Sequence, residues 1–273
     1  MRHFAIGSAE VGGARPLIVA GPCVVESEAL CLEVATHLKA LCEVRGLPFV
    51  FKASYRKANR SSGASYSGPG TDEGLAVLAQ VKRTLGVPVL TDVHDEAEVP
   101  AAAEVADVLQ IPAFLSRQTG LLVAAARTGR AVNVKKGQFL APADMANAVE
   151  KIVQAGGSRI LLTERGTTFG YGDLVVDMRG LVTMRETGWP VLYDATHSLQ
   201  RPGGAETRGD RRFAVPLMRA AVACGLDGLF FEAHPDPDRA LSDAATQLPL
   251  AQVASFLDEA VRVHESLQEA ARG

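Results

Sequence analysis

The chain has few aromatic residues, no cysteine pattern typical of disulfides or zinc modules, and no long apolar run. Aromatic residues make up 5% of its 273 residues, with a single tryptophan, and its four cysteines form no CxxC pair. A disulfide-stapled small domain is therefore excluded, and we expect reduced cysteines. The longest apolar run, residues 121–126, is far shorter than the roughly 18 residues of a spanning helix, so no membrane partner is expected.

A strong charge of one sign is also missing. The formal net charge is −3, so the composition does not point to nucleic acid or an anionic membrane as a partner. Hydrophobic residues (47%) and charged residues (22%) are close to the globular average, which excludes a disordered chain. The first residues, MRHFAIGSAEVGG, lack the apolar core of a secretory signal, so a cytoplasmic protein is expected.

The chain does contain a regular alternation of short apolar runs and longer amphipathic segments. The short runs predict strands at residues 16–20, 48–52, 88–91, 108–111, 131–134, 159–163, 190–193 and 228–231. The amphipathic segments predict helices at residues 29–45, 72–85, 96–103, 119–128, 143–155, 176–187, 213–224 and 250–267. Several of these helices are followed by glycine, which accepts the left-handed conformation that ends a helix.

Eight strand–helix units with continuously apolar strands indicate a parallel sheet covered by helices. In a chain of this length they predict an α/β fold, a single closed (β/α)8 TIM barrel domain over residues 1–273, with residues 1–15 as an N-terminal extension. An open doubly wound sheet is the alternative. Active sites of such barrels lie at the carboxyl ends of the strands, so the residues there are the candidates for function.

Every predicted strand runs into polar or ionisable residues at its carboxyl end. The basic residues at or just after these ends are Lys52, Lys57, Arg60, Lys135, Arg165 and Arg117. Convergence of so many cations is costly without anions, so it predicts an anionic ligand, a phosphate or carboxylate, with more than one anionic group. A solvated surface charge would explain any one of these residues alone, but their shared position favours a pocket.

A second group of strand-end residues mixes metal-ligand types. Cys23, His197 and Glu232 follow strands that are consecutive around a closed barrel, and Asp243 lies in the loop after the last strand. A thiolate, an imidazole and carboxylates suit a divalent transition metal and are a poor set for Mg²⁺ or Ca²⁺. The spacing equally allows an inert buried cysteine, a hydrogen-bonded histidine and carboxylates paired with arginine.

Specific motifs recur along nearly the whole chain. They are AGPCVVES (20–27), FKASYRKANRSS (51–62), TDVH (91–94), LQIPAFLSRQT (109–119), NVKKGQF (133–139), FGYGDLVVDMRG (169–180), DATHSLQ (194–200), FFEAHPDP (230–237) and LSDAATQLPL (241–250). Together they resemble the 3-deoxy-D-manno-octulosonate 8-phosphate synthases. The resemblance implies a transferase that condenses phosphoenolpyruvate with arabinose 5-phosphate for lipopolysaccharide synthesis, releases inorganic phosphate, and usually forms a homotetramer.

The resemblance also implies roles for individual residues. Those implied to bind phosphoenolpyruvate or lie close to it are Lys57, Lys135, Arg165, Lys52, Ser54 and Gln110. Asp92, at the end of the third predicted strand, is a further candidate for substrate binding. Those implied to contact arabinose 5-phosphate are Asn59, Arg60 and Ser61, with Arg117 reaching the sugar phosphate from a neighbouring subunit. The candidate catalytic residues are Lys57, Asn59, His197 and Asp243, the last two through proton transfer.

The family that the motifs resemble has a metal-dependent branch with cysteine in the AGPC motif and a metal-independent branch with asparagine there. Cys23 and the SDA sequence around Asp243 resemble the first branch. This implies Fe²⁺, Zn²⁺, Mn²⁺ or Co²⁺ held by Cys23, His197, Glu232 and Asp243, orienting either the aldehyde or the water. One departure is that the loop after the seventh strand lacks the usual Gly-Gly-x-Arg, which leaves open the role of Arg211 or Arg212.

The implied reaction begins with attack of C3 of phosphoenolpyruvate on the aldehyde carbon, continues with water addition at C2, and ends with C–O cleavage. The nearest alternative is the 3-deoxy-D-arabino-heptulosonate 7-phosphate synthases, which use erythrose 4-phosphate. Their corresponding motif is KPRTS-like, so Asn59 and Ser61 favour the five-carbon sugar. More distant alternatives are a sialic acid synthase-like enzyme and a non-catalytic barrel that binds phosphosugars or metal.

Overall fold

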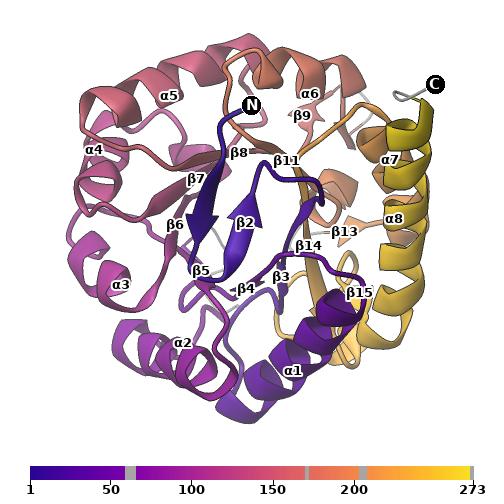
Figure 1. Ribbon diagram of the computed structural model, residues 1–273. Helices are drawn as coiled ribbons and strands as arrows, with labels where there is room; N and C mark the ends of the chain where they lie inside the picture. Colours follow the sequence, from indigo (N-terminus) through magenta and orange to yellow (C-terminus); the bar gives the residue numbers. More distant parts are fainter. Residues whose placement is uncertain (59–65, 170–171, 203–207, 271–273) are drawn as a thin grey trace.

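The computed structural model describes residues 1–58, 66–169, 172–202 and 208–270 (Figure 1). Within them a closed parallel barrel consists of β3 (Leu17–Gly21), β4 (Phe49–Lys52), β5 (Val89–Asp92), β6 (Val108–Ile111), β7 (Ala131–Lys135), β8 (Ile160–Glu164), β11 (Val191–Asp194) and β14 (Gly228–His234). Each strand pairs with the next, and β14 pairs with both β11 and β3, which closes the ring. The predicted (β/α)8 barrel is confirmed, and the open sheet is wrong.

Helices surround the barrel on its outside (Figure 1). They are α1 (Glu28–Val44), α2 (Thr71–Leu85), α3 (Val99–Val105), α4 (Thr119–Arg127), α5 (Met145–Gln154), α6 (Met178–Arg185), α7 (Ala214–Ala223) and α8 (Val253–Ala270). Among the described residues no helix is long and apolar enough to cross a membrane. The prediction of residues 96–103 is the least accurate, because Asp95 accepts the backbone N–H groups of Ala97 and Glu98 in a turn and α3 begins only after it.

Short elements connect the barrel units. They include the strands β9 (Thr167–Thr168), β10 (Leu174–Val175), β12 (Gln200–Arg201), β13 (Arg208–Gly209) and β15 (Leu248–Pro249), and the 3₁₀ helices η1 (Ala113–Leu115), η2 (Pro142–Asp144), η3 (His197–Leu199), η4 (Arg211–Phe213), η5 (Pro237–Arg239) and η6 (Leu250–Gln252). Most of them follow barrel strands, so the loops at the carboxyl end of the barrel carry much of the irregular structure.

The N-terminal extension forms a hairpin that covers one end of the barrel. Strands β1 (Phe4–Ile6) and β2 (Ala9–Val11) pair in antiparallel register. Figure 1 shows this hairpin lying across the centre of the ring. Ile6, Ala9 and Val11 are buried against the apolar residues inside the barrel. The hairpin was missed because three-residue strands give little periodicity; it closes the amino-terminal end, so a ligand has to enter from the other end.

The interior of the barrel is layered because side chains alternate between the two faces of a strand. One buried apolar layer, next to the hairpin, consists of Val19, Val50, Leu90, Val108, Ala131, Leu161, Leu192 and Phe230. Two residues further along seven of these strands lie buried polar side chains, here called the polar ring: Lys52, Asp92, Gln110, Asn133, Thr163, Asp194 and Glu232. Because every second side chain of a strand faces the interior, the polar ring lies directly above the apolar layer, at the carboxyl end of the barrel. We call this apolar layer the floor.

Gly21 occupies the eighth position of this layer because nothing larger fits. A Cβ atom there would lie 2.0 Å from the carbonyl oxygen of Lys52 on the neighbouring strand. We expect Gly21→Ala to lower the free energy of unfolding, measured by urea denaturation, by about 3 kcal/mol. Gly46→Ala is the control, because φ is +61° there and no atom lies within 4 Å; it should cost only about 1 kcal/mol. Equal losses of unfolding free energy in the two variants would contradict the steric argument.

Candidate active site

The charged half of the polar ring is held in buried ion pairs. The Lys52 Nζ donates to Glu232 Oε1 at 2.5 Å and to the Cys23 carbonyl oxygen at 2.8 Å. Lys135 lies two residues beyond the ring position of its strand and donates to Asp194. Both lysines thus have carboxylate partners in the barrel itself, which the sequence argument did not count.

Lys57 and Arg165 differ from these two lysines. Among the described residues, the nearest carboxylate oxygen to Lys57 Nζ belongs to Glu232, at 3.9 Å, beyond hydrogen-bond distance. Burial lowers the pKa of Lys57, but the charges of Cys23, Glu232 and other anionic groups outweigh it and raise that pKa. The Arg165 guanidinium donates to the neutral Gln200 Oε1 at 2.6 Å. Both groups remain cations suited to a phosphate or carboxylate.

The other four members of the ring, Asp92, Gln110, Asn133 and Thr163, form a line of hydrogen bonds. Asp92 accepts from the hydroxyl of Ser54 and from the side-chain amide of Gln110. Asn133 donates to Gln110 Oε1 at 2.8 Å, and Thr163 donates to Asn133 Oδ1 at 2.7 Å. Burial raises the pKa of Asp92, but the positive charges of Lys57 and Lys52 outweigh it and lower that pKa. Asp92 is therefore an ionised acceptor at one end of the line.

The four side chains of the mixed ligand group come together at the open end. Ligand atoms of Cys23, Glu232 and Asp243 all lie within 4.8 Å of one another. His197 Nε2 is 3.6 Å from Glu232 Oε1 and 3.7 Å from Asp243 Oδ2. The Cys23 sulfur is 3.1 Å from Asp243 Oδ2. Ligands of a tetrahedral Zn²⁺ ion, at about 2.0–2.3 Å from the metal, lie about 3.3–3.8 Å apart. The two His197 distances fall in this range, and the Cys23–Asp243 distance is slightly shorter.

Two further observations fit a cation at this cluster. Glu232 Oε2 is buried and has no hydrogen-bond partner among the described residues, and an unpaired buried carboxylate oxygen is costly. Burial, followed by the charges of Asp243 and Glu232, raises the pKa of the Cys23 thiol well above its usual value. A divalent cation would satisfy the oxygen and favour the thiolate. Asp243 also has φ +48°, the one left-handed non-glycine backbone among the described residues, and such strain is often found at functional positions.

Asp194 orients His197 and was given no role by the sequence analysis. Its Oδ1 accepts the backbone N–H groups of Thr196 (3.0 Å) and His197 (2.9 Å), and its Oδ2 lies 2.8 Å from His197 Nδ1. Burial raises the pKa of Asp194, but the charges of His197 and Lys135 outweigh it and lower that pKa well below its usual value. The ionised carboxylate holds the proton on Nδ1, so Nε2 faces the ligand cluster. The Asp-x-x-His spacing of Asp194 and His197 was the feature of the sequence that could have identified this pair.

The loop that carries Asp243 is fixed by residues that the sequence left without a role. Gln200 donates to Asp243 Oδ1 at 3.2 Å while accepting from Arg165, and so joins the ligand cluster to the unpaired cation. Arg211 donates to the carbonyl oxygens of Ala244 and Ala245. Arg211 therefore braces this loop, which answers the question left open by the missing Gly-Gly-x-Arg sequence.

The second lysine of the NVKK motif lies outside the polar ring. Lys136 is fully buried, and its Nζ donates to Thr167 Oγ1 at 3.0 Å and lies 3.6 Å from Glu164 Oε1. It also contacts the carbonyl oxygens of Gly137 and Leu140. Because adjacent residues of a strand point to opposite faces, Lys135 reaches the site while Lys136 ties the loops after β7 and β8 together.

The remaining predicted residues are Asn59, Arg60, Ser61 and Arg117. Asn59, Arg60 and Ser61 lie outside the described residues. Arg117 is exposed beyond η1, and among the described residues it shares no hydrogen bond or ion pair with the polar ring. His94 Nδ1 lies 3.0 Å from Glu98 Oε2, a contact within the loop after β5.

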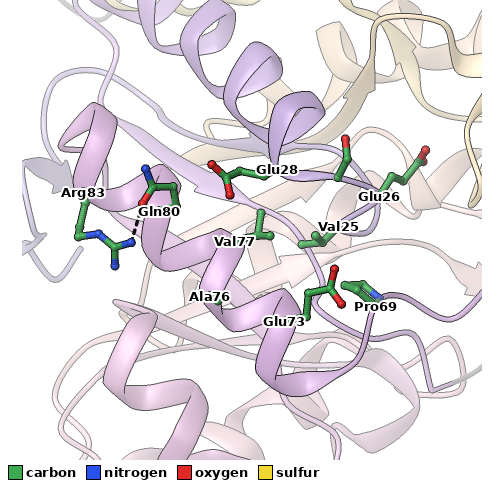
Figure 2. A pocket seen from close by; sticks show the side chains of 10 residues that line it. Val25, Glu26, Glu28, Pro69, Glu73, Ala76, Val77, Gln80 and Arg83 are labelled. Atoms are coloured by element: carbon green, nitrogen blue, oxygen red, sulfur yellow. Dashed lines mark hydrogen bonds between the residues drawn. The ribbon is translucent and has the colours of Figure 1, made fainter.

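A second hollow lies on the flank of the barrel, between the start of α1 and the length of α2 (Figure 2). It measures about 450 Å³, and its wall includes Glu26, Glu28 and Glu73. Arg83, its basic residue, is hydrogen-bonded to Gln80 at 2.6 Å. Because carboxylates repel anions, this hollow is unsuited to a phosphorylated ligand, whereas the open end of the barrel offers Lys57 and Arg165, which have no carboxylate hydrogen bond among the described residues.

A barrel with this polar, partly cationic mouth is the architecture of a (β/α)8 enzyme that acts on small anionic molecules. A family model described as the DAHP synthetase I family matches residues 6–269. The chain is 56% identical over 255 residues, 92% of each chain, to the 2-dehydro-3-deoxyphosphooctonate aldolase of Syntrophotalea carbinolica. It is 54% identical to the proteins of that name from Trichlorobacter lovleyi, over 94% of this chain and 95% of the other, and Methylococcus capsulatus, over 94% and 92%.

The chain belongs to the DAHP synthetase I family. The name of the relatives describes an eight-carbon keto-deoxy sugar acid phosphate, the same compound as 3-deoxy-D-manno-octulosonate 8-phosphate. The resemblance to the octulosonate 8-phosphate synthases is thereby confirmed.

Proposed function

We propose that this protein condenses phosphoenolpyruvate with D-arabinose 5-phosphate and water, giving 3-deoxy-D-manno-octulosonate 8-phosphate and inorganic phosphate for lipopolysaccharide synthesis. The observation that carries the proposal is the identity of 56% over 92% of both chains with a relative named for that eight-carbon compound. The reaction transfers an enolpyruvyl-derived unit to an aldehyde, so the activity is that of a transferase.

The polar ring and its neighbours supply what this reaction needs. Lys57 and Arg165, the cations without a carboxylate hydrogen bond among the described residues, are placed to bind the anionic groups of phosphoenolpyruvate. Lys135, fixed by Asp194 and lying 3.5 Å from the centre of the Phe230 ring, adds a third positive group. Holding both substrates in a fixed orientation removes an entropic barrier to attack of C3 on the aldehyde carbon.

Charge changes during the reaction also match these residues. Attack by C3 leaves negative charge on the former aldehyde oxygen, which must gain a proton, and C2 becomes electron-poor and accepts water. His197 and Asp243, 3.7 Å apart, are the titratable groups proposed to move these protons, His197 through Nε2 while that nitrogen is not bound to a metal. Cleavage of the C–O bond of the resulting hemiketal phosphate then releases inorganic phosphate, whose charge is balanced by Lys57 and Arg165.

A divalent transition metal, Fe²⁺, Zn²⁺, Mn²⁺ or Co²⁺, is part of the proposal. Its ligands would be Cys23, His197, Glu232 and Asp243, and the separations of their ligand atoms and the unpartnered Glu232 Oε2 support this. When bound, the ion would supply a Lewis acid that orients an oxygen of substrate or water. The donor set favours these metals over Mg²⁺ or Ca²⁺.

The proposal includes a cytoplasmic homotetramer in which Arg117 completes the sugar-phosphate site of a neighbouring subunit. It follows from the resemblance, and two observations support it. Arg117 is exposed and lies away from its own polar ring, and Phe114, three residues earlier, is 57% exposed. Exposed aromatic side chains are frequent in interfaces between subunits.

The test is phosphate release from phosphoenolpyruvate with arabinose 5-phosphate and, in parallel, with erythrose 4-phosphate. The second sugar is included because the family model bears the name of the heptulosonate enzyme. We expect at least a hundredfold preference in kcat/KM for the five-carbon sugar. Preference for the four-carbon sugar would assign the heptulosonate activity, and release with neither would favour a barrel that only binds phosphosugars.

A further inference from the structure

The hydrogen bonds between Thr163, Asn133, Gln110 and Asp92 of the polar ring all have the same direction. The Thr163 hydroxyl donates to Asn133, the Asn133 amide donates to Gln110, and the Gln110 amide donates to Asp92. The line crosses four consecutive strands, β8, β7, β6 and β5, and Asp92 terminates it. An ionised carboxylate only accepts, so every donor in the line has to point toward Asp92.

Burial makes this direction difficult to reverse. Asn133 and Thr163 have no exposed surface, and Gln110 is 2% exposed. A flipped amide at Gln110 would place its oxygen against the Asp92 carboxylate and its amino group against the Asn133 amino group. Each mismatch leaves a buried polar group unpaired, which costs about 1–3 kcal/mol.

We propose that Asn133 and Thr163 are positioning residues that fix the side-chain amide of Gln110, so that its amino group presents a second N–H to phosphoenolpyruvate. The inference rests on the proposed function and deepens it. Gln110 Oε1 is occupied by Asn133, and one N–H of its amino group by Asp92. In a planar amide whose oxygen faces β7 and whose nitrogen faces β5, the other N–H points away from the wall of β6, into the barrel.

The second N–H of Gln110 has no acceptor in the hydrogen bonds of the described residues. Lys52 at the end of β4, Lys57 after β4 and Lys135 at the end of the neighbouring β7 bring positive charge to the space around Asp92 and the end of β6. An anionic oxygen of phosphoenolpyruvate is the acceptor that suits both an N–H and these cations. Thr163, two strands away from Gln110, therefore acts on the substrate only through Asn133.

The test compares Thr163→Val, which keeps the shape and removes the donor, with Thr163→Ser, which keeps the hydroxyl. We expect the valine variant to raise both the KM and the calorimetric Kd for phosphoenolpyruvate about fivefold to tenfold, and the KM for the sugar to stay within about twofold. The serine variant should restore wild-type values. Asn133→Leu, which leaves Gln110 Oε1 without its donor, should raise both constants at least as much.

A merely structural role would lower the melting temperature of Thr163→Val and leave its affinity for phosphoenolpyruvate unchanged, and that result would overturn the inference. The inference would also be overturned if the valine and serine variants lost affinity for phosphoenolpyruvate equally. If Asn133→Leu does not fold, the Thr163 pair decides alone. Calorimetry with phosphoenolpyruvate alone needs no sugar and no turnover, so the inference is tested even if the wild-type protein releases no phosphate, the result that would overturn the proposed function.

Discussion

Removal of bound metal by a chelator is expected to reduce phosphate release by about 100-fold or more, and added Mn²⁺ or Zn²⁺ to restore it. The reason is the cluster of Cys23, Glu232 and Asp243, whose ligand atoms lie within 4.8 Å of one another, with His197 Nε2 beside them. Loss of a Lewis acid worth several kcal/mol corresponds to this factor. Undiminished release by protein shown to be metal-free by elemental analysis would contradict the metal assignment.

Two cysteine variants make this experiment specific. Cys23→Asn introduces the residue that the metal-independent branch carries, so we expect it to keep measurable activity and to lose the response to the chelator. Cys31→Ala removes a buried cysteine of α1 outside the cluster and should respond as the wild type does. Loaded with Co²⁺, wild-type protein should show a thiolate-to-cobalt absorption band that Cys23→Asn lacks. A band that persists in Cys23→Asn would show that this thiol is not a ligand.

Asp194→Asn is expected to have the second large effect. The substitution keeps the shape and removes the charge, so Lys135 becomes a buried cation without its partner and His197 loses the acceptor that fixes its tautomer. Breaking a buried ion pair costs about 3–5 kcal/mol of unfolding free energy. Loss of the group that orients a metal-ligating histidine typically costs 10- to 100-fold in metal affinity or activity.

Urea denaturation, metal titration and kcat/KM together check this expectation. Asp177→Asn is the matched control, because Asp177 also accepts from a basic side chain, Arg179, but at the surface. Exposed pairs contribute little to stability, so this variant should behave as the wild type in all three measurements. If Asp194→Asn also behaves as the wild type in these measurements, Asp194 does not orient His197.

Much of the fold and the list of candidate residues could be predicted from sequence because both depend on local patterns. Apolar residues recur at different spacings in strands and in helices. The eight strands were therefore located to within a few residues, for example β6 at Val108–Ile111. The barrel rule then directed attention to the residues at the carboxyl ends of the strands. Side-chain alternation explains why Lys52, Asp92 and Gln110 share one ring, since each lies two residues beyond an apolar residue of the floor.

The partners of these residues were decided only by the tertiary structure. Lys52 pairs with Glu232, 180 positions away, and Lys135 pairs with Asp194, 59 positions away. No local period encodes such distances, so the sequence argument identified neither of these pairs and gave Asp194 no role. The hairpin of β1 and β2 escaped prediction for a related reason, since its short strands are stabilised by the barrel interior that they cover. Sequence determined which chemical groups reach the mouth of the barrel; closure of the ring determined which of them neutralise one another and which remain for a ligand.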